Sequence, residues 1–225
     1  MRRQLGPAVR MVVVLTVLLG LAYPLVATGV AQALFRSSAD GSQVKVNGQV
    51  VGSKNLGQTF TEAKYFHGRP SAAGIGASGS LDDQGKPADP KDPSVINSGG
   101  SNLGPSNPTL TKDVAERVAA YRAENHLSAS TPVPVDAVTS SGSGVDPEIS
   151  VANARLQAPR VAAARHLKVG QVDQLIDTYT TGRSLGFLGN AGVNVLELNL
   201  ALDALVLVPA ATPAANVAAT AATSR

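Results

Sequence analysis

One stretch of this chain, residues 11–35, decides its architecture and reads MVVVLTVLLGLAYPLVATGVAQALF. It carries no charge, and it is longer than the roughly 20 apolar residues that a helix needs to cross a bilayer. Inside a bilayer every backbone polar group needs a partner within the segment, so we expect a helix with a local kink at Pro24. Thr16 and Gly20 lie one turn apart, which is typical of close packing against another helix. The sequence therefore predicts one transmembrane helix.

The charges beside this span predict its orientation. Arg2, Arg3 and Arg10 precede it, whereas Arg36 and Asp40 follow it. An excess of basic residues marks the cytoplasmic end of a membrane span. We therefore expect a cytoplasmic stub, residues 1–10, and a C-terminal domain outside the cytoplasm, in a single-pass protein of the cell membrane.

A secretory signal peptide is the competing interpretation of the same stretch. Ala31-Gln32-Ala33 has the small-x-small form of a cleavage site, and cleavage there would release a secreted binding module. The apolar part of a signal peptide usually has only about 7–15 residues, and the apolar run here is longer. The length of the run favours a membrane anchor.

The composition excludes several classes of function. The 19 basic and 16 acidic residues differ by three, which is the number of arginines before the span, so the remainder is neutral. A neutral domain lacks the basic patch that nucleic-acid binding requires. The chain has no cysteine, which excludes disulfides, thiolate metal sites and a cysteine nucleophile. Its 225 residues are enough for one domain beyond the anchor.

Residues 36–208 are expected to form this domain, with an α+β fold. Residues 42–53 alternate apolar and polar side chains around Asn47-Gly48, which predicts a β-hairpin with a type I′ turn. Residues 74–93 are rich in Gly, Pro, Asp and Ser and predict a mobile loop. Residues 209–225 consist largely of Ala, Thr and Pro and predict a disordered tail.

Two helices are predicted from capping residues. Thr111 is the expected N-cap of a helix that ends near Leu127. Ser150 is the expected N-cap of a second helix. Pro159 then requires a kink or a break, which leaves open whether one helix or two short helices follow.

Periodicity predicts the last two elements. Val172, Leu175, Ile176 and Tyr179 fall at i, i+3, i+4 and i+7, the spacing of an amphipathic helix, for which Gly182 is a fitting stop. The following stretch has period two and predicts a half-buried strand, because leucines alternate with other residues in LELNLALD, residues 196–203.

No catalytic or metal-binding pattern is present. His67, His126 and His166 have neither HxxxH nor HExxH spacing, so we expect structural roles for them and no metal site. A G-x-S-x-G motif is also absent. A membrane-tethered serine hydrolase that uses Ser143 or Ser98 would need a histidine supplied by tertiary contacts.

The sequence contains no independent nucleotide-binding motif. Both the P-loop pattern and the Rossmann glycine pattern are missing. A nest of backbone N–H groups for an anion is one interpretation of Ser98, Gly99, Gly100, Ser101 and Asn102. A tight glycine turn with local hydrogen bonds is the simpler one.

Five stretches stand out in order along the chain: LLGLAYPL (18–25), GQTFTEAKYFHGRPSA (57–72), INSGGSNLGPSNP (96–108), VPVDAVTSSGSGVDPEIS (133–150) and VNVLELNLALD (193–203). Together they resemble the C subunit of the Kdp potassium-transporting ATPase, over most of the chain. The sequence departs from that family at His67, where Trp is usual, and at Asn190-Ala191-Gly192, where Glu-Pro-Arg is usual.

The resemblance implies a complex that imports potassium at the expense of ATP. Its partners would be a pore-like potassium-binding subunit, a P-type ATPase subunit and a small peptide subunit. This chain would be a non-catalytic accessory subunit, needed for assembly and without a cofactor of its own. The resemblance also implies a catalytic chaperone that raises the affinity of the ATPase subunit for ATP, and it makes the 98–102 stretch a nucleotide-binding candidate. Because ATP is cytoplasmic and the predicted domain is not, such an effect would pass through the transmembrane helices.

Three loops of the domain are predicted to dock on the outer face of the pore subunit. Their Gly, Pro, Asn and Ser residues fix the shape of a loop, and no catalytic pattern accounts for them. The predicted docking residues are Tyr65, Phe66, Gly68, Arg69, Pro70, Ser71, Asn102, Pro105, Asn107, Pro108, Ser141, Gly142, Ser143, Gly144, Asp146 and Pro147.

Overall fold

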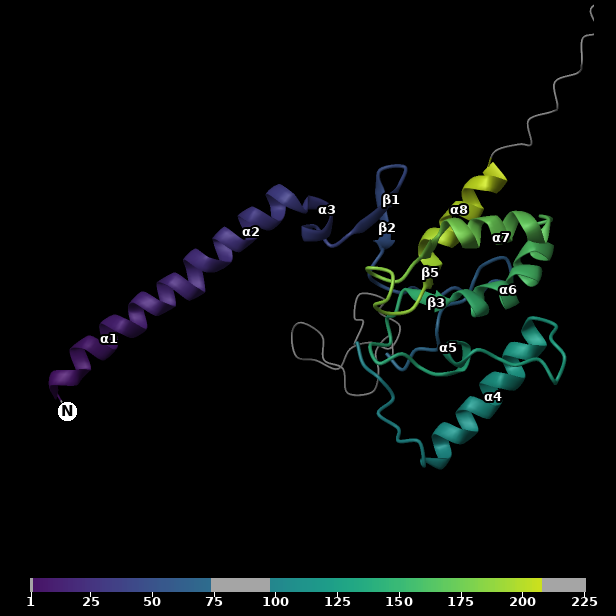
Figure 1. The fold of residues 1–225 in the computed structure, drawn as a ribbon, viewed down its shortest axis with the longest axis horizontal. Helices are drawn as coiled ribbons and strands as arrows, with labels where there is room; N and C mark the ends of the chain where they lie inside the picture. Colours follow the sequence, from purple (N-terminus) through teal and green to yellow (C-terminus); the bar gives the residue numbers. More distant parts are fainter. Residues whose placement is uncertain (1, 74–97, 208–225) are drawn as a thin grey trace, which may run out of the picture.

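The computed structural model describes residues 2–73 and 98–207 and shows a long helix that leads into a mixed domain (Figure 1). The predicted loop 74–93 and tail 209–225 lie outside the described residues. The elements in chain order are α1 (Arg2–Val17), the π-helical turn η1 (Leu18–Ala22), α2 (Tyr23–Leu34), α3 (Arg36–Ala39), β1 (Gln43–Val46), β2 (Gln49–Ser53), α4 (Pro108–Glu124), α5 (Val135–Val138), β3 (Glu148–Ser150), α6 (Val151–Ala164), α7 (Val169–Thr178), β4 (Thr180–Thr181), β5 (Gly192–Asn194) and α8 (Val195–Leu207).

The anchor helix is long and apolar enough to cross a membrane. It runs from Arg3 to Leu34, 32 residues, and none of its apolar window is buried against the domain. Where a kink was predicted, the helix widens into η1, and Tyr23 N–H donates to the Leu18 carbonyl. A wide turn relieves the clash between the Pro24 ring and the preceding turn, so the helix continues through the proline.

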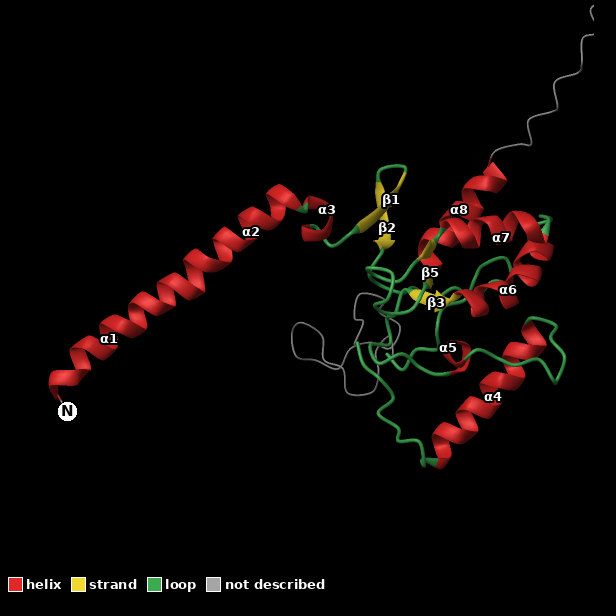
Figure 2. Ribbon diagram, viewed as in Figure 1, coloured by secondary structure: helices red, strands yellow, loops and turns green. Residues whose placement is uncertain are grey.

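Helices make up most of the domain, and its strands are short (Figure 2). The predicted hairpin is confirmed: β1 pairs antiparallel with β2, and Asn47 and Gly48 take φ values of 50° and 81°. The other sheet was not predicted. It has the order β3-β5-β4, with both pairs antiparallel.

The helix α4 begins earlier than predicted. Its N-cap is Asn107, not Thr111, because Asn107 Oδ1 accepts from Thr109 N–H at 2.8 Å and Pro108 occupies the first turn. Proline suits that position, since its missing N–H would be unpaired there in any case. The helix ends at Glu124 rather than near Leu127.

Helices α6 and α7 agree with their predictions in part. Ser150 caps α6 as predicted, with its hydroxyl accepting from Asn153 N–H at 3.1 Å. Pro159 lies on the exposed side of α6, where the freed carbonyl can reach water, and one helix runs through it. Helix α7 buries Val172 and Ile176 as predicted, but it ends at Thr178, so Gly182 is not its stop.

The predicted strand at residues 196–203 is wrong, because this stretch lies in α8. Asn194 Oδ1 accepts from Glu197 N–H at 3.0 Å and so caps the first turn. The buried residues Val195, Leu198, Asn199 and Leu202 have the i, i+3, i+4, i+7 spacing of a helix face. Leucine is also a strong helix former, so its alternation here was a coincidence of composition.

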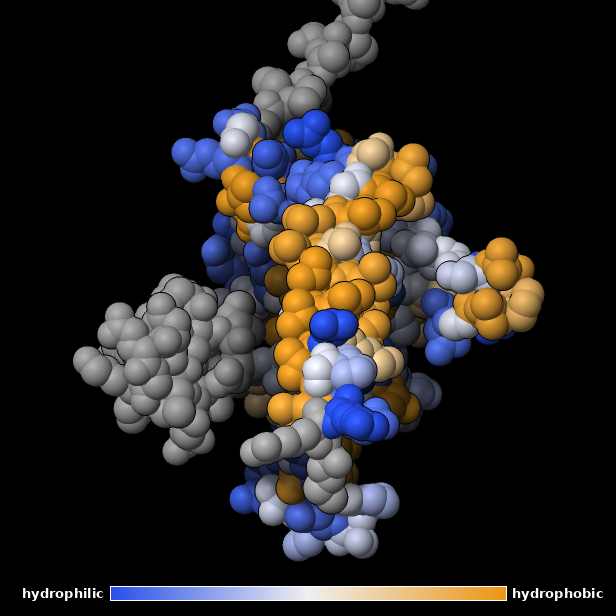
Figure 3. Space-filling model, turned by 90° about the vertical axis from the view of Figure 1, so that its left-hand side faces the viewer, coloured by the Kyte–Doolittle hydropathy of each residue, from blue (hydrophilic) through white to orange (hydrophobic). Residues whose placement is uncertain are grey.

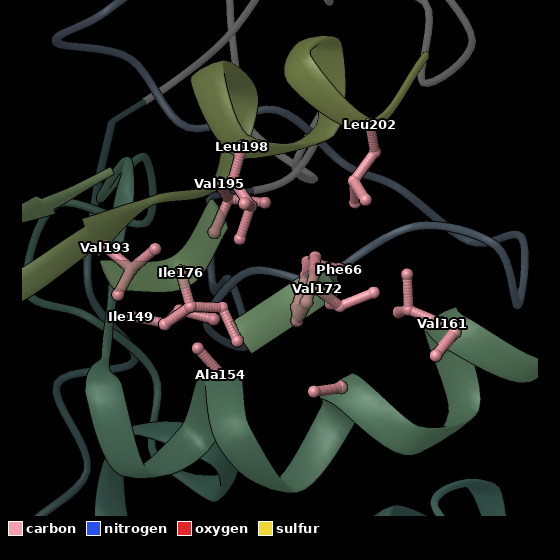
Figure 4. Packing of buried hydrophobic residues seen from close by; sticks show 12 residues of the cluster. Phe66, Ile149, Ala154, Val161, Val172, Ile176, Val193, Val195, Leu198 and Leu202 are labelled. Atoms are coloured by element: carbon pink, nitrogen blue, oxygen red, sulfur yellow. The ribbon is translucent and has the colours of Figure 1, made fainter. Parts of the chain in front are cut away.

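The core lies between α6, α7, α8 and the three-stranded sheet (Figure 4). The side chain of Phe66 enters it from the irregular segment that follows β2, and it is completely buried. The cluster comprises Phe66, Ile149, Ala154, Ala158, Val161, Ala162, Val172, Ile176, Val193, Val195, Leu198 and Leu202.

Candidate functional site

Two of the predicted docking loops and the start of the third converge in space although they are far apart in sequence. Gly57 N–H donates to the Val145 carbonyl at 2.8 Å, and Ser71 Oγ donates to the Gly144 carbonyl at 2.6 Å. From the third loop, Gly99 N–H donates to the Ser143 carbonyl at 2.8 Å. We call this meeting point the loop junction; it comprises residues 68–73, 98–100 and 141–147.

An ion pair fastens two of these loops. Arg69 Nη1 lies 2.9 Å from Asp146 Oδ2, and Arg69 Nη2 donates to the Thr139 carbonyl at 3.4 Å. The other carboxylate oxygen of Asp146 accepts from Glu148 N–H at 3.2 Å, which ties the pair to the start of β3. Both side chains are about three-quarters covered, so the pair is shielded from solvent more than a surface ion pair would be.

Glycine is required where the loops approach most closely. Gly144 has a φ of +69°, and a Cβ there would lie 2.7 Å from the carbonyl oxygen of Gly99 and 2.7 Å from the backbone nitrogen of Ala73. Both the conformation and the contact exclude a side chain. The second glycine of the Ser-Gly-Ser-Gly stretch at 141–144 is therefore required by the structure, because three loops meet at its backbone.

A hollow of about 660 Å³ adjoins the junction. Its lining combines backbone-rich loop segments with the Arg69–Asp146 pair, the phenyl ring of Phe60 and the imidazole of His67. The residues around it are Gly57, Gln58, Thr59, Phe60, His67, Gly68, Arg69, Pro70, Ser71, Ala73, Gly144, Val145 and Asp146.

The segment that leads into the junction is held by buried amide side chains. Asn199 pairs with both backbone groups of Phe66: its Oδ1 accepts from the N–H at 2.8 Å, and its Nδ2 donates to the carbonyl at 3.0 Å. Gln157 pairs with His67 in the same way, at 2.8 and 3.1 Å. These side chains take the place of a neighbouring strand, so an irregular segment satisfies its backbone inside the domain.

Two arginines complete this attachment. Arg160 Nη1 donates to the carbonyls of Ala63 and Tyr65, at 2.6 and 3.0 Å. Arg165 Nε donates to the Lys64 carbonyl at 2.6 Å. Every carbonyl from residue 63 to residue 67 therefore accepts a hydrogen bond from a side chain of α6 or α8 or from Arg165, the C-cap of α6. These polar residues could not be predicted from the sequence, because nothing local marks a buried amide or guanidinium.

A second polar network lies at the N-terminus of α6. Asp136 accepts from Ser150 N–H and Ser150 Oγ, both at 2.8 Å, and from Asn153 Nδ2 at 3.0 Å. Burial alone would raise the pKa of the Asp136 carboxyl, but the hydrogen bonds from Ser150 and Asn153 outweigh it and hold the pKa below its ordinary value. Tyr121 donates to Asn153 Oδ1 at 2.8 Å, and burial raises the pKa of that hydroxyl.

The remaining predicted docking residues lie in different parts of the domain. Phe66 is a core residue, and Tyr65 donates to Asp203 Oδ2 at 3.2 Å. Asn107 and Pro108 form the start of α4. Asn102 and Pro105 are exposed on the segment before it. The structure thus brings the 68–73 and 141–147 loops together, whereas the 102–108 part of the third loop leads away from the junction.

The serine candidates have no histidine partner among the described residues. Ser143 Oγ accepts from Val145 N–H at 3.2 Å, and Ser98 Oγ donates to the Ser143 carbonyl at 2.9 Å. This geometry holds loops together and contains no proton acceptor for a nucleophile. Within the described ranges, no group of three His, Asp or Glu residues is arranged for a metal ion.

Part of the candidate anion nest is already used inside the domain. Gly99 N–H donates to the Ser143 carbonyl, and the hydroxyl of Ser98 donates to the same atom. Asn102 has a positive φ of 53°, as glycine-rich turns often require. The described contacts of this stretch are those of a turn that packs on the neighbouring loop.

Comparison with known proteins identifies the family. The sequence model of the KdpC family, described as "K+-transporting ATPase, c chain", matches residues 5–204. The chain belongs to this family. Among its relatives is the potassium-transporting ATPase KdpC subunit of Mycobacterium tuberculosis (strain ATCC 25618 / H37Rv), 55% identical over 205 residues, with 91% of this chain and all of the relative covered. The KdpC subunit of Caulobacter vibrioides (strain NA1000 / CB15N) is 50% identical over 205 residues, with 91% of this chain and 94% of the relative covered.

Membership of the KdpC family confirms the resemblance read from the five stretches. It makes the chain a subunit of a potassium-transporting ATPase and not an enzyme by itself. The KdpC match also spans both the anchor helix and the domain, so the loop junction belongs to the part of the chain that the family shares.

Proposed function

We propose that this chain is an outward-facing accessory subunit of a Kdp-type potassium pump and that the loop junction docks it on the pore-like potassium-binding subunit. The observation that carries the proposal is the convergence of loops around Gly144 and the Arg69–Asp146 pair, beside a hollow and without any catalytic arrangement in the described residues. Rigid, polar, glycine-shaped loops on a scaffold are suited to recognising a partner surface. The P-type ATPase subunit and the small peptide subunit complete the proposed complex.

The proposed topology places residues 1–10 in the cytoplasm and the domain on the outer side. Its support is the excess of arginines before the apolar stretch 11–35 over those after it. The chain has no cysteine, so a single cysteine introduced at Leu5 or at Ala164 reports unambiguously which side of the membrane that position faces. In intact cells a membrane-impermeant thiol reagent should label only the cysteine at Ala164; labelling at Leu5 instead would reverse the topology.

We also propose that the chain raises the ATP affinity of the P-type ATPase subunit without binding ATP itself. The proposed topology separates the domain from cytoplasmic ATP, so the coupling would pass through the transmembrane helices. Complexes prepared with and without this chain should differ in the KM for ATP. A photoreactive ATP analogue should label the ATPase subunit only, whereas labelling of residues 98–102 would show direct binding.

The docking proposal is tested by removing the guanidinium of Arg69. Arg69→Ala in the full chain should lower the recovery of the pore and ATPase subunits on affinity purification, because Asp146 loses its partner and the loops separate. The matched control is Arg155→Ala, since Arg155 pairs with Asp177 at a similar distance, 3.0 Å, on exposed surface away from the junction. Protease resistance of each variant shows that it is folded. Full recovery and full transport by a folded Arg69→Ala variant would remove the docking role.

A further inference from the structure

A short loop between β4 and β5 presents large apolar side chains to solvent. At its tip Leu185 is 82% exposed, Phe187 is 69% exposed and Leu188 is 50% exposed. Ser184 and Leu188 form an isolated antiparallel bridge that closes the tip into a tight turn. None of the three apolar side chains belongs to the core cluster or packs against it. We call residues 183–189 the apolar tip.

The apolar tip has a defined backbone conformation with internal hydrogen bonds. Leu188 N–H donates to the Ser184 carbonyl at 2.9 Å, and Gly186 N–H donates to the Arg183 carbonyl at 3.0 Å. Leu185 takes a φ of +54°, which is uncommon for a residue other than glycine, asparagine or aspartate. The turn thus pairs several of its own N–H groups while its leucine and phenylalanine side chains stay exposed.

The base of the tip is fastened to the segment that emerges from the anchor helix. The loop ends at β5, and Asn194 at the end of that strand donates from Nδ2 to the Lys54 carbonyl at 2.8 Å. Lys54 also pairs with Glu197 at 2.6 Å. Lys54 directly follows the β1–β2 hairpin, which starts eight residues after Phe35. The tip therefore belongs to the part of the domain that is tied most directly to the membrane span.

The views of the whole molecule agree with this placement. The loop between β4 and β5 lies on the side of the domain that faces the anchor helix (Figure 1). Seen from that side, apolar side chains project beside the apolar column of the anchor helix (Figure 3). A surface of this kind, on a domain tethered to a bilayer by a short connection, is positioned to meet lipid.

The charge and hydrogen bonding of the tip favour lipid over a protein partner. Arg183 is the only charged residue between Gly182 and Gly192, and a cation beside apolar side chains suits an anionic lipid surface. A protein interface normally surrounds its apolar centre with a polar rim that forms hydrogen bonds across the contact. Here three N–H groups of the tip, those of Gly186, Phe187 and Leu188, are paired within it, which lowers the cost of entering the acyl boundary.

We propose that the apolar tip inserts into the bilayer leaflet on the domain's side of the membrane and forms a second membrane attachment beside the anchor helix. Leu185, Phe187 and Leu188 would enter the boundary between headgroups and acyl chains, roughly 5–10 Å deep, as interfacial apolar segments do. Arg183 would stay at the headgroups. This attachment fixes the orientation of the domain above the membrane, and it does not depend on the docking proposed for the loop junction.

The absence of cysteine makes the test direct. Phe187→Cys in the full chain is labelled with an environment-sensitive fluorophore and reconstituted, without other subunits, in vesicles of phosphatidylethanolamine and phosphatidylglycerol. We expect blue-shifted emission, loss of most of the fluorescence when lipids with acyl-chain quenchers are included, and protection from iodide in the aqueous phase. Leu185→Cys should behave in the same way.

The matched control is Ala164→Cys, an exposed site at the end of α6, which ends on the side of the domain away from the anchor (Figure 1). Its label should be quenched by iodide and not by the lipid quenchers. A label at Phe187 that stays open to iodide and unaffected by lipid quenchers would overturn the proposal. Protection from iodide that appears only after the pore subunit is added would also overturn the proposal, because a protein surface and not lipid would then cover the tip.

Discussion

Replacing Asn199 by leucine tests whether buried amides hold the segment that carries the docking loop. Leucine branches at the same atom as asparagine but neither donates nor accepts hydrogen bonds. Asn199 is 1% exposed and pairs with both backbone groups of Phe66, which is itself fully buried. Each buried backbone group left without a partner costs about 1–3 kcal/mol, so Asn199→Leu should lower the free energy of unfolding by about 2–6 kcal/mol.

The measurement is pulse proteolysis of the full chain in detergent across a series of urea concentrations. The variant should show a lower midpoint with an unchanged dependence on urea, which marks a loss of stability without a change in the unfolding reaction. Asn190→Leu is the control, because Asn190 is exposed and its replacement should change stability by less than about 0.5 kcal/mol. A loss below about 1 kcal/mol for Asn199→Leu would refute the argument, since two unpaired buried groups cannot cost so little.

Three further predictions follow from the second network, the loop junction and the ion pair. Asp136→Asn should lower the free energy of unfolding by about 1–3 kcal/mol at neutral pH, because the amide nitrogen that replaces one carboxylate oxygen cannot accept the hydrogen bond that Ser150 donates to that oxygen. The folded-state pKa of Asp136 is depressed, so this contribution is complete above the unfolded value of about 3.9 and disappears as the pH falls through the folded-state value. Urea unfolding of both proteins at several pH values checks this, and a difference that persists at the lowest pH would contradict it. Gly144→Ala should cost at least about 1–2 kcal/mol for the left-handed backbone alone and should reduce recovery of the complex, whereas Gly170→Ala, which lies outside the junction and whose added Cβ would meet no described atom within 4 Å, should lower neither. For Arg69→Ala, we expect a lower yield of intact complex with little loss of protease resistance; an unfolded variant would assign Arg69 to the fold and not to docking.

Local signals allowed much of the fold to be predicted. The anchor helix, the hairpin around Asn47-Gly48 and the buried face of α7 each depend on residues close in sequence. The errors occurred where two local patterns competed. Leucines at every second position of 196–203 satisfied period two, but Asn194 caps the first turn and the residues that are buried follow period 3.6.

The candidate site could be predicted only in part, because tertiary contacts create it. Glycine-rich composition marked the loop that contains Gly144, but only the folded chain shows that its carbonyl and that of Ser143 receive bonds from two other loops. Gln157 and Asn199 had no signal at all, since a polar residue in a helix is usually exposed. Their partners lie 90 and 133 residues away in sequence, a separation over which local patterns carry no information.

The central claim, that this chain is a subunit of a potassium-transporting complex, is tested most directly by affinity purification of the tagged chain from detergent-solubilised membranes. The co-purifying proteins are identified by mass spectrometry, and the eluate is assayed for potassium-stimulated ATPase activity. We predict that a P-type ATPase subunit and a pore-like subunit accompany the chain and that the preparation hydrolyses ATP in response to potassium. A chain that elutes alone, from membranes that contain the other subunits, would contradict the account.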